Sequence, residues 1–476
     1  MIFEIKKLKI DRIKAVNIAI IFFLALTIFF GNKFRERNYA EVPFPGETAD
    51  EYSFGWLGLS LIKDKYPLSW SGILVGKDYD YQRINVDGIF DKNPGRLPFP
   101  LEKPWLYHPP LMGLMVGGYA YLHGARDFIE TSVILLRRPM LKIAILNTIL
   151  IFVLATLLFD KYVGILSAFF YSVNPSIVIS SRIAVAENAL IPLFLLTLIF
   201  ALLYIKKKKL FYWTVACVFS SVAVLFKISG VAIPLSLFLI ALFFGGSDKK
   251  KMVVYSVLSA GLPLMVFALY GAFFSWSTFV EVFIKANANR FWGASSEIFY
   301  TVIANPKITK FYTDGWLTAS WISLFAISFN GFFKDKNIKF LTISVFSYFI
   351  IFLIFGGESY GWYRFPYFPF LMIALAYFLK KLWEETNVFV FSGIMLLPLG
   401  TIIHKVVGVE NFQQLIPYFR MGVILSLVSF MAPALIKEKY SKIIQRTFII
   451  LVFIIAIYFT IKEIYYFNVD KWYFAY

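Results

Sequence analysis

The residues best suited to chemistry form a short acidic segment, in which Glu47, Asp50 and Glu51 lie within five positions. The chain has a formal net charge of +18 and is 59% hydrophobic, so carboxylates are scarce elsewhere. Such a cluster indicates a place where negative charge acts on a proton, a metal ion or a sugar hydroxyl. Asp50 is the candidate general base. All three acids are also candidate ligands for a divalent metal.

The same segment has a structural interpretation. Thr48-x-x-Glu51 matches a capping box, in which Thr48 caps a helix and Glu51 occupies its third position. Acidic side chains in a first turn also stabilise the helix dipole. The two interpretations are compatible, because a cap can fix a helix whose first-turn Asp50 points into a cavity.

Other polar residues interrupt apolar sequence further along the chain, and each has a simpler alternative. Glu102-Lys103 is by default an ion pair or a solvated turn. His108 fits an interfacial histidine beside Tyr107 as well as it fits a ligand for a phosphate or a sugar hydroxyl. Snorkelling toward water would account for a lone arginine or lysine near a bilayer edge, and an interfacial belt would account for aromatic residues. These alternatives apply to Arg182, to Glu187 as a helix-start residue, to Lys227, and to Tyr363-Arg364 in the segment 358–367.

The elements that must position these residues are membrane helices. Runs of roughly 17–25 apolar residues recur along all 476 residues and are typical of transmembrane helices. We therefore predict an all-α polytopic membrane protein, with residues 1–476 forming one transmembrane domain. About 13 spans are expected, at 15–31, 139–159, 162–180, 185–205, 210–226, 230–246, 252–275, 315–333, 340–356, 365–379, 386–403, 421–436 and 447–461.

Basic clusters favour the cytoplasmic side and fix the predicted topology. The clusters are Lys206–Lys209, Lys249–Lys251, Lys334 with Lys336 and Lys339, Lys380-Lys381, and Lys437 through Arg446. All five clusters and the N-terminus lie on the cytoplasmic side only if the short segment 109–122 does not cross the membrane. The C-terminus is then on the extracytoplasmic side. Arg137 and Arg138 fall outside, against the rule. The candidate site residues all fall on the extracytoplasmic side, in part within the loop 32–138; the loop 276–314 lies on that side too, and juxtamembrane helices are expected in the first loop.

Several classes of protein and site are disfavoured. The positive charge fits topology and contact with anionic membrane lipid better than nucleic-acid binding. Cys217 is the single cysteine, and His108, His123 and His404 lie too far apart for a sequence-local metal site. The basic N-terminus precedes an apolar run without a small-residue cleavage site, which favours a retained first span.

The order of these motifs resembles that of the GT-C superfamily of integral-membrane glycosyltransferases, particularly protein O-mannosyltransferases and lipid A aminoarabinose transferases. The matching residues are Asp50-Glu51, His108-Pro109-Pro110-Leu111, Arg182-x4-Glu187, Lys227-x2-Gly230, and Arg364-x-Pro366 with Tyr367 and Pro369. The chain departs from the pattern at Leu106, where the mannosyltransferases carry an acid. The departures leave the sugar and the acceptor open.

The resemblance implies a GT-C fold and transfer of a sugar from a polyprenyl-phosphate donor to a hydroxyl of a protein, glycan or lipid, with inversion at the anomeric carbon. In that mechanism Asp50 acts as base, while Glu51 holds a hydroxyl or orients the helix. The expected substrate or lipid-phosphate contacts are Lys103, His108, Arg182, Glu187, Lys227, Tyr363 and Arg364. A divalent metal is a possible cofactor, and the composition suggests a prokaryotic plasma membrane. The alternatives are a transporter or flippase of lipid-linked sugars, and a polysaccharide ligase.

Overall fold

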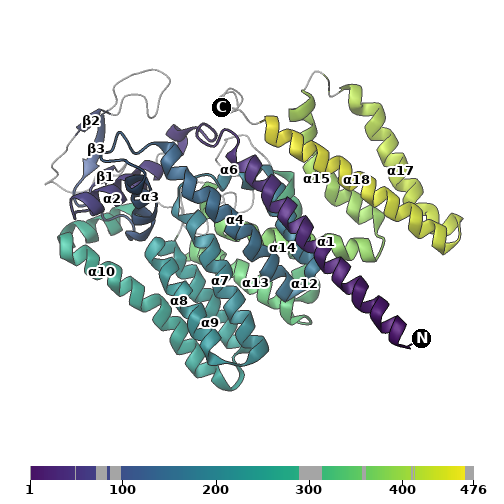
Figure 1. Ribbon diagram of the computed structural model, residues 1–476, viewed down its shortest axis with the longest axis horizontal. Coiled ribbons are helices and arrows are strands. Elements are labelled where there is room, and N and C mark those ends of the chain that lie inside the picture. The colour runs from purple at the N-terminus through teal and green to yellow at the C-terminus, as the bar shows by residue number, and fades with distance from the viewer. Residues whose placement is uncertain are drawn as a thin grey trace.

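The computed structural model describes residues 2–48, 50–70, 83–85, 98–288, 314–355, 361–408, 411 and 413–466. It is a bundle of long helices with a small outer layer at one end (Figure 1). The predicted spans fall mainly on helices, except that the range 162–180 is divided at Asn174 between two helices. Eight helices among the described residues are long and apolar enough to cross a membrane. The all-helical membrane fold is therefore confirmed. The helices of the bundle are α1 (Ile2–Glu36), α4 (Val133–Leu158), α5 (Lys161–Val173), α6 (Pro175–Ser180), α7 (Ala186–Lys207), α8 (Leu210–Phe226), α9 (Ala232–Phe244), α10 (Lys249–Ala288), α12 (Gly315–Gly331), α13 (Lys336–Phe355), α14 (Phe368–Glu384), α15 (Val388–Val407), α17 (Ile416–Leu435) and α18 (Glu438–Tyr466).

The outer layer follows α1 in the sequence. It contains a 3-10 turn η1 (Pro45–Thr48), helices α2 (Asp50–Lys63) and α3 (Leu111–Leu122), and three short antiparallel strands in the order β1-β3-β2. The strands are β1 (Ser69–Trp70), β2 (Arg83–Asn85) and β3 (Pro98–Glu102), with Ser69 opposite Glu102. The sequence did not predict this sheet, because the two prolines of β3 argue against a strand.

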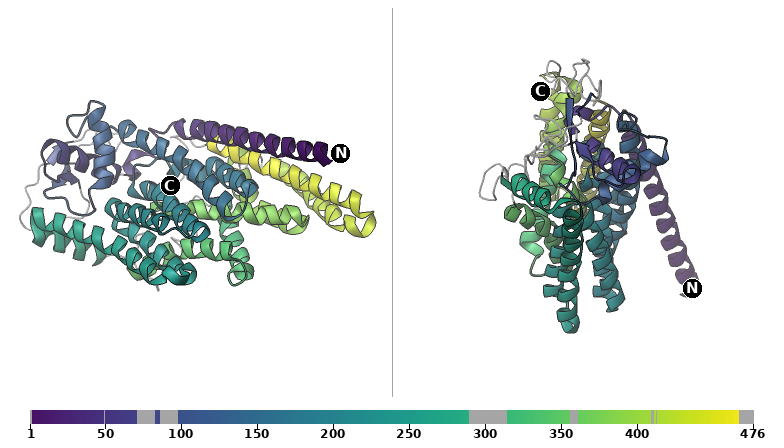
Figure 2. Two further views of the ribbon diagram at one scale, coloured as in Figure 1. Left: turned by 60° about the horizontal axis from the view of Figure 1, so that its bottom comes forward. Right: turned by 90° about the vertical axis from the view of Figure 1, so that its left-hand side faces the viewer.

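Helix α3 is the short segment that was predicted not to cross the membrane. It lies beside α2 in the outer layer in both views (Figures 1 and 2). The two helices approach so closely that a methyl group added at Gly58 would overlap the Gly113 carbonyl, and one added at Gly117 would overlap the Gly55 carbonyl. Small residues thus let two backbones pack together, as they do between membrane helices.

The remaining helices include one break and are joined in two places by 3-10 segments. Helix α10 breaks at Ser275, whose φ of −170° and ψ of 104° are extended, and then continues to Ala288. Of the predicted loop 276–314, residues 289–313 lie outside the described part. A second 3-10 segment, η4 (Gly361–Tyr367), leads into α14, and η2 (Ile228–Val231) joins α8 to α9.

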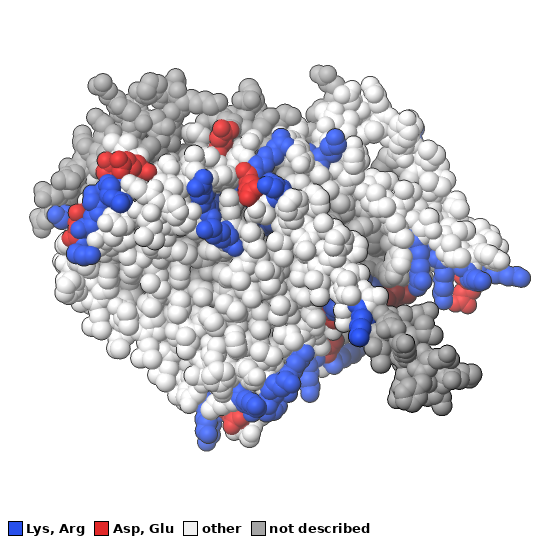
Figure 3. All heavy atoms as spheres, in the orientation of Figure 1, with Lys and Arg blue, Asp and Glu red and all other residues white. Residues whose placement is uncertain are grey.

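Charged side chains gather at the two edges of an apolar zone (Figure 3). Two contacts join helix ends at one of these edges: Lys380 pairs with Asp160 at 2.8 Å, and the Tyr204 hydroxyl donates to Asp248 at 2.8 Å. These contacts bring together the ends of α4, α7 and α14 and the start of α10, where the basic clusters were predicted to share one side. We call this end of the bundle the inner end, and the end that carries α2 and α3 the outer end.

Candidate active site

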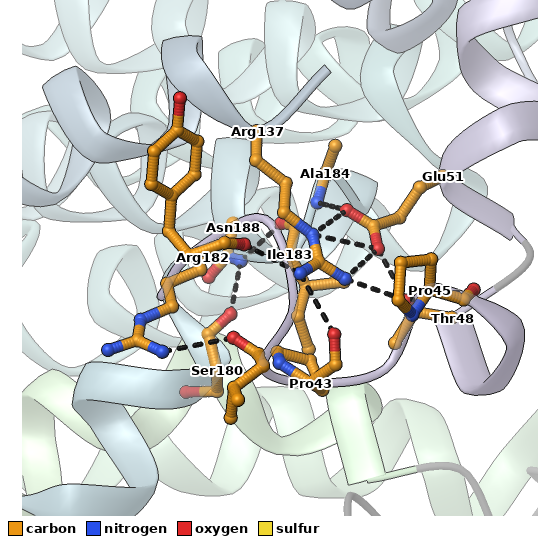
Figure 4. A network of polar contacts seen from close by, with 12 residues as sticks. Pro43, Pro45, Thr48, Glu51, Arg137, Ser180, Arg182, Ile183, Ala184 and Asn188 are labelled. Atoms are coloured by element: carbon orange, nitrogen blue, oxygen red, sulfur yellow. Dashed lines mark hydrogen bonds and ion pairs between the residues drawn. The ribbon is translucent and has the colours of Figure 1, made fainter. Parts of the chain in front are cut away.

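Glu51 lies at the centre of a buried hydrogen-bond network at the outer end (Figure 4). Its carboxylate accepts from Arg137 Nη2 at 2.6 Å and from Arg137 Nε at 2.9 and 3.1 Å. It also accepts from the Thr48 hydroxyl and, at 2.8 Å, from the Ala184 backbone N–H. Both charged side chains are fully buried. Glu51 therefore ties the start of α2 to the start of α4 and to the connection between α6 and α7.

This arrangement differs from the expected capping box. Helix α2 begins at Asp50, and the Thr48 and Glu51 side chains bond to each other. One oxygen of Glu51 reaches a backbone N–H 133 residues away, that of Ala184. The local pattern correctly indicated that Thr48 and Glu51 act together, but tertiary contacts redirected the carboxylate away from its own helix.

Two further arginines fix the chain that leads into this helix. Arg182 donates to the carbonyls of Phe34 at 2.7 Å and Val42 at 3.0 Å. Arg35 donates to the Tyr171 carbonyl and the Ser181 hydroxyl, both at 2.9 Å. Arg182 is 3% exposed, so the snorkelling alternative is wrong for it. Its guanidinium bonds to backbone carbonyls of the chain that leads into α2.

Arg182 lies close to three other arginines. Burial lowers the pKa of Arg182 to about 9, and the neighbouring charges of Arg137, Arg35 and Arg37 act in the same direction. In contrast, the pKa of the Tyr52 hydroxyl is raised, by burial and by the nearby Glu51 carboxylate.

A second buried ion pair continues the site from α7 to η4. Lys227, which follows α8, pairs with Glu187 in the first turn of α7 at 2.5 Å. The Lys227 ammonium also lies 4.8 Å from the centre of the Tyr363 ring. Lys227 is 6% exposed and Arg364 is 2% exposed. The snorkelling alternative is therefore wrong for Lys227, and the motifs that contain Glu187, Lys227 and Tyr363-Arg364 meet at one place.

His108 reaches the site through α2. Its ring stacks on Phe54, with ring centres 5.6 Å apart, and contacts Trp105 edge to face at 5.8 Å. Phe54 lies one helical turn after Asp50. Lys103 is exposed and its ammonium lies 5.2 Å from the Tyr66 ring centre, while its neighbour Glu102 is buried and accepts from the Tyr107 hydroxyl at 2.9 Å. The structure thus places His108 against the acidic helix.

Asp50 is the first residue of α2 and is half-buried. Its neighbour Glu51 is held by Arg137, Thr48 and Ala184, so the backbone that carries Asp50 is fixed from three other elements. An acid that is partly accessible on a rigid element has the properties that a positioned base requires.

Arg137 is the residue that sequence reasoning missed. It donates to the carbonyls of Tyr39 at 2.7 Å and Pro43 at 2.9 Å in addition to Glu51. The available signal was its position on the outer side, against the positive-inside rule. Its burial beside a carboxylate explains the exception, because a paired arginine contributes a tertiary contact rather than a topological signal.

These contacts reduce the number of acids that could bind the predicted divalent metal. No group of three or more histidine, cysteine or acidic side chains suited to a metal occurs within the described part of the chain. The Glu47 side chain lies outside that part. Both Glu51 oxygens accept from Arg137, and a cation placed there would meet the guanidinium charge. The prediction therefore concerns Glu47 and Asp50.

Comparison with known protein families gives one match. Residues 107–271 match a family model described as dolichyl-phosphate-mannose-protein mannosyltransferase. That range includes His108, Arg182, Glu187 and Lys227 and excludes Asp50. No curated protein matches the sequence.

Solved membrane enzymes match the structure over nearly its full length. ArnT from Cupriavidus metallidurans in the apo state gives a TM-score of 0.57 at 13% identity, covering 94% of this chain and 77% of that one. This chain has the GT-C fold. The structure of ArnT from the same organism bound to undecaprenyl phosphate gives a TM-score of 0.56 at 12% identity, with the same coverage of both chains.

The second similar GT-C structure is longer. The apo oligosaccharyltransferase of Archaeoglobus fulgidus gives a TM-score of 0.53 at 12% identity, and the match covers 94% of this chain and 55% of that one. The present chain thus spans about half of the length of that enzyme. At these identities the similarity establishes the shared GT-C fold alone.

Proposed function

We propose that the protein transfers a sugar from a polyprenyl-phosphate carrier to a hydroxyl acceptor on the extracytoplasmic face, with Asp50 as general base. The observation that carries the proposal is the convergence of the polar motifs at the outer end. Contacts join Glu51 to Ala184, Glu187 to Lys227, and Lys227 to Tyr363. Residues that are spread over more than 300 positions of an apolar chain thus form two groups, and the short segment from Ala184 to Glu187 links them.

The chemistry needs one base and one anion site. Asp50 would take the acceptor hydroxyl proton as that oxygen bonds to the anomeric carbon. The bond from the anomeric carbon to the phosphate oxygen breaks at the same time, and the lipid phosphate leaves with the electron pair. A single displacement of this kind inverts the configuration. The reaction needs neither an oxidant nor a reductant.

Positive side chains would stabilise the departing phosphate. Lys227 and Arg364 are the proposed phosphate partners, since a fixed cation in a buried site stabilises developing negative charge without reorganisation. Glu187 would hold Lys227 in place. Tyr363, His108 and Lys103 would hydrogen-bond the donor or acceptor, whereas Arg182 and Glu51 would act by positioning the Asp50 turn.

The ArnT and oligosaccharyltransferase structures support the donor class. One similar structure contains undecaprenyl phosphate, and another contains dolichol phosphate with an inhibitory peptide at a TM-score of 0.50 and 12% identity. We extend this carrier chemistry to the present chain as part of the proposal. A prokaryotic plasma membrane is the proposed location.

The test uses the purified full-length protein and a panel of hexosyl and pentosyl polyprenyl phosphates. The wild type should release free lipid phosphate, and Asp50→Asn should lower turnover by about 10²–10⁴-fold. Asp64→Asn, an exposed acid just after the same helix, is the matched control and should keep full turnover. If Asp50→Asn turns over the donor as fast as the wild type, Asp50 is not the general base. If the protein transports the lipid without releasing lipid phosphate, a flippase is favoured instead.

A further inference from the structure

A large apolar groove opens at the inner end of the bundle, opposite the candidate active site. It has a volume of about 970 Å³ and lies between α5, α14, α15 and α18. Its walls include Leu166 and Phe170 from α5, Phe391 from α15, and Phe453 from α18. The volume is at the upper end of the range for small-molecule sites.

The arrangement of α1 and α18 exposes this groove. The two helices meet near the outer end, where Phe34 and Tyr465 contact edge to face with ring centres 6.1 Å apart. They diverge toward the inner end in two views (Figures 1 and 2). Helix α18 therefore leaves part of α5 uncovered on the inner half of the bundle.

The depth of the groove corresponds to one leaflet of a bilayer. Along α5 the lining runs from Lys161 to Phe170. At about 1.5 Å per residue, this stretch of helix is roughly 14 Å long. Half of a hydrocarbon core of about 30 Å has the same thickness. An acyl chain that starts at the inner edge would thus be covered along its length.

The mouth of the groove is charged and carries a cation on each of two opposing walls. Lys380 is engaged by Asp160 and Glu384, both at 2.8 Å. Lys161 instead donates to the neutral Asn17 amide oxygen at 2.9 Å. On the α18 side, the Arg446 guanidinium lies 5.3 Å from the ring centre of Trp383, which lines the groove.

We propose that this groove binds an anionic diacyl phospholipid of the cytoplasmic leaflet. The acyl chains occupy the apolar wall, and the phosphodiester is attracted by Lys161 and Arg446. The charge of these two residues selects an anionic headgroup, because Lys380 already satisfies the two carboxylates at the mouth. Basic residues near a membrane surface attract anionic lipid by about 1 kcal/mol each.

The proposed occupant is distinct from the sugar donor. The donor phosphate must reach Lys227 and Arg364 at the outer end, whereas the groove opens beside Asp160 and Lys380 at the inner end. The inference therefore concerns a second lipid site and is independent of glycosyl transfer. A polyprenyl phosphate carries similar chemistry, so the test must include one.

The experiment titrates delipidated full-length protein with lipids and counts bound molecules by native mass spectrometry. The probes are phosphatidylglycerol and phosphatidylcholine with identical acyl chains, and undecaprenyl phosphate. The double variant Lys161→Glu/Arg446→Glu should weaken phosphatidylglycerol binding by at least about tenfold. Leu166→Trp should fill the groove and weaken binding of both diacyl lipids. Lys207→Glu, an exposed lysine at the end of α7, is the control and should bind as the wild type does.

Three outcomes would overturn the proposal. They are equal affinity for phosphatidylglycerol and phosphatidylcholine, unchanged binding in Leu166→Trp, and displacement of phosphatidylglycerol by undecaprenyl phosphate at an equal concentration. A monodisperse elution profile identifies variants that are folded. Because the readout is lipid binding, failure here would leave the proposed sugar transfer untouched, and failure of sugar transfer would leave the groove untouched.

Discussion

The two ends of the bundle hold their charged side chains in different ways. At the outer end, Glu51 and Arg137 pair while fully buried, and Glu187 pairs with a lysine that is 6% exposed. At the inner end the lysines after α7 are exposed, and the Lys380–Asp160 pair is partly open to solvent. The inner charges thus stay accessible to solvent, whereas the outer charges pair inside the protein and fix its tertiary contacts.

The largest stability effect is expected at Arg137. Arg137→Ala leaves the Glu51 carboxylate buried without its guanidinium, and removal of one partner of such a pair costs about 3–5 kcal/mol. Thermal unfolding of the protein in detergent should show it. The adjacent Arg138→Ala removes an exposed arginine whose contact with the Tyr39 hydroxyl is 3.3 Å long, and should change little. Equal losses in the two variants would contradict the contrast between buried and exposed charge.

Variants of the second ion pair, Lys227 with Glu187, distinguish an effect on stability from an effect on donor turnover. Lys227→Met should destabilise the fold because Glu187 is fully buried. The double variant Lys227→Met/Glu187→Leu removes both charges, and we expect it to recover most of the unfolding temperature while donor turnover stays low. Turnover that recovers together with stability would show that Lys227 serves packing alone. Measurement of both quantities on the same preparations decides this point.

A smaller effect is expected where α2 meets α3. Gly58→Ala places a methyl group against the Gly113 backbone, and overpacking of this kind costs about 1–3 kcal/mol. The control is Gly118→Ala, where the nearest atom, Ile62 Cδ1, would be 3.5 Å from the new carbon, an ordinary contact. Unfolding temperatures should fall for the first variant only. If Gly58→Ala is neutral, the outer layer is more pliable than its backbone contact indicates.

The smallest effect is expected at the inner end. Lys380→Ala removes a partly exposed pair and should cost under about 1 kcal/mol. Although burial alone would raise it, the hydrogen bonds from Lys380 and from the Val163 and Tyr162 N–H groups lower the pKa of Asp160 below its ordinary 3.8. The pair therefore stabilises the protein above about pH 4, and its contribution is lost as the pH falls through the lowered pKa. The unfolding temperatures of the wild type and of Lys380→Ala should therefore become equal at that pH. A difference between them that does not change with pH would contradict this.

Much of the fold could be read from the sequence because its signals are local. A run of apolar residues must form a helix in lipid, where every backbone group has to bond within the chain. The predicted ranges fall mainly on helices, although the range 162–180 is divided at Asn174 between α5 and α6. The short segment 109–122, predicted from its length and the distribution of basic residues not to cross, forms the 12-residue helix α3 beside α2. The β1-β3-β2 sheet escaped prediction because its strands are short and one carries two prolines.

The sequence by itself determined which residues are rare and costly in this chain, and therefore which ones need an explanation. It could not determine their partners. Arg137 and Glu51 are 86 positions apart, and Lys227 and Glu187 are 40 apart. Only the packing of α2, α4 and α7 brings them together, since a buried charge is tolerated only where the fold supplies its counter-charge. Tertiary structure thus decided that Glu51 holds the turn, leaving Asp50 as the acid for the proposed chemistry.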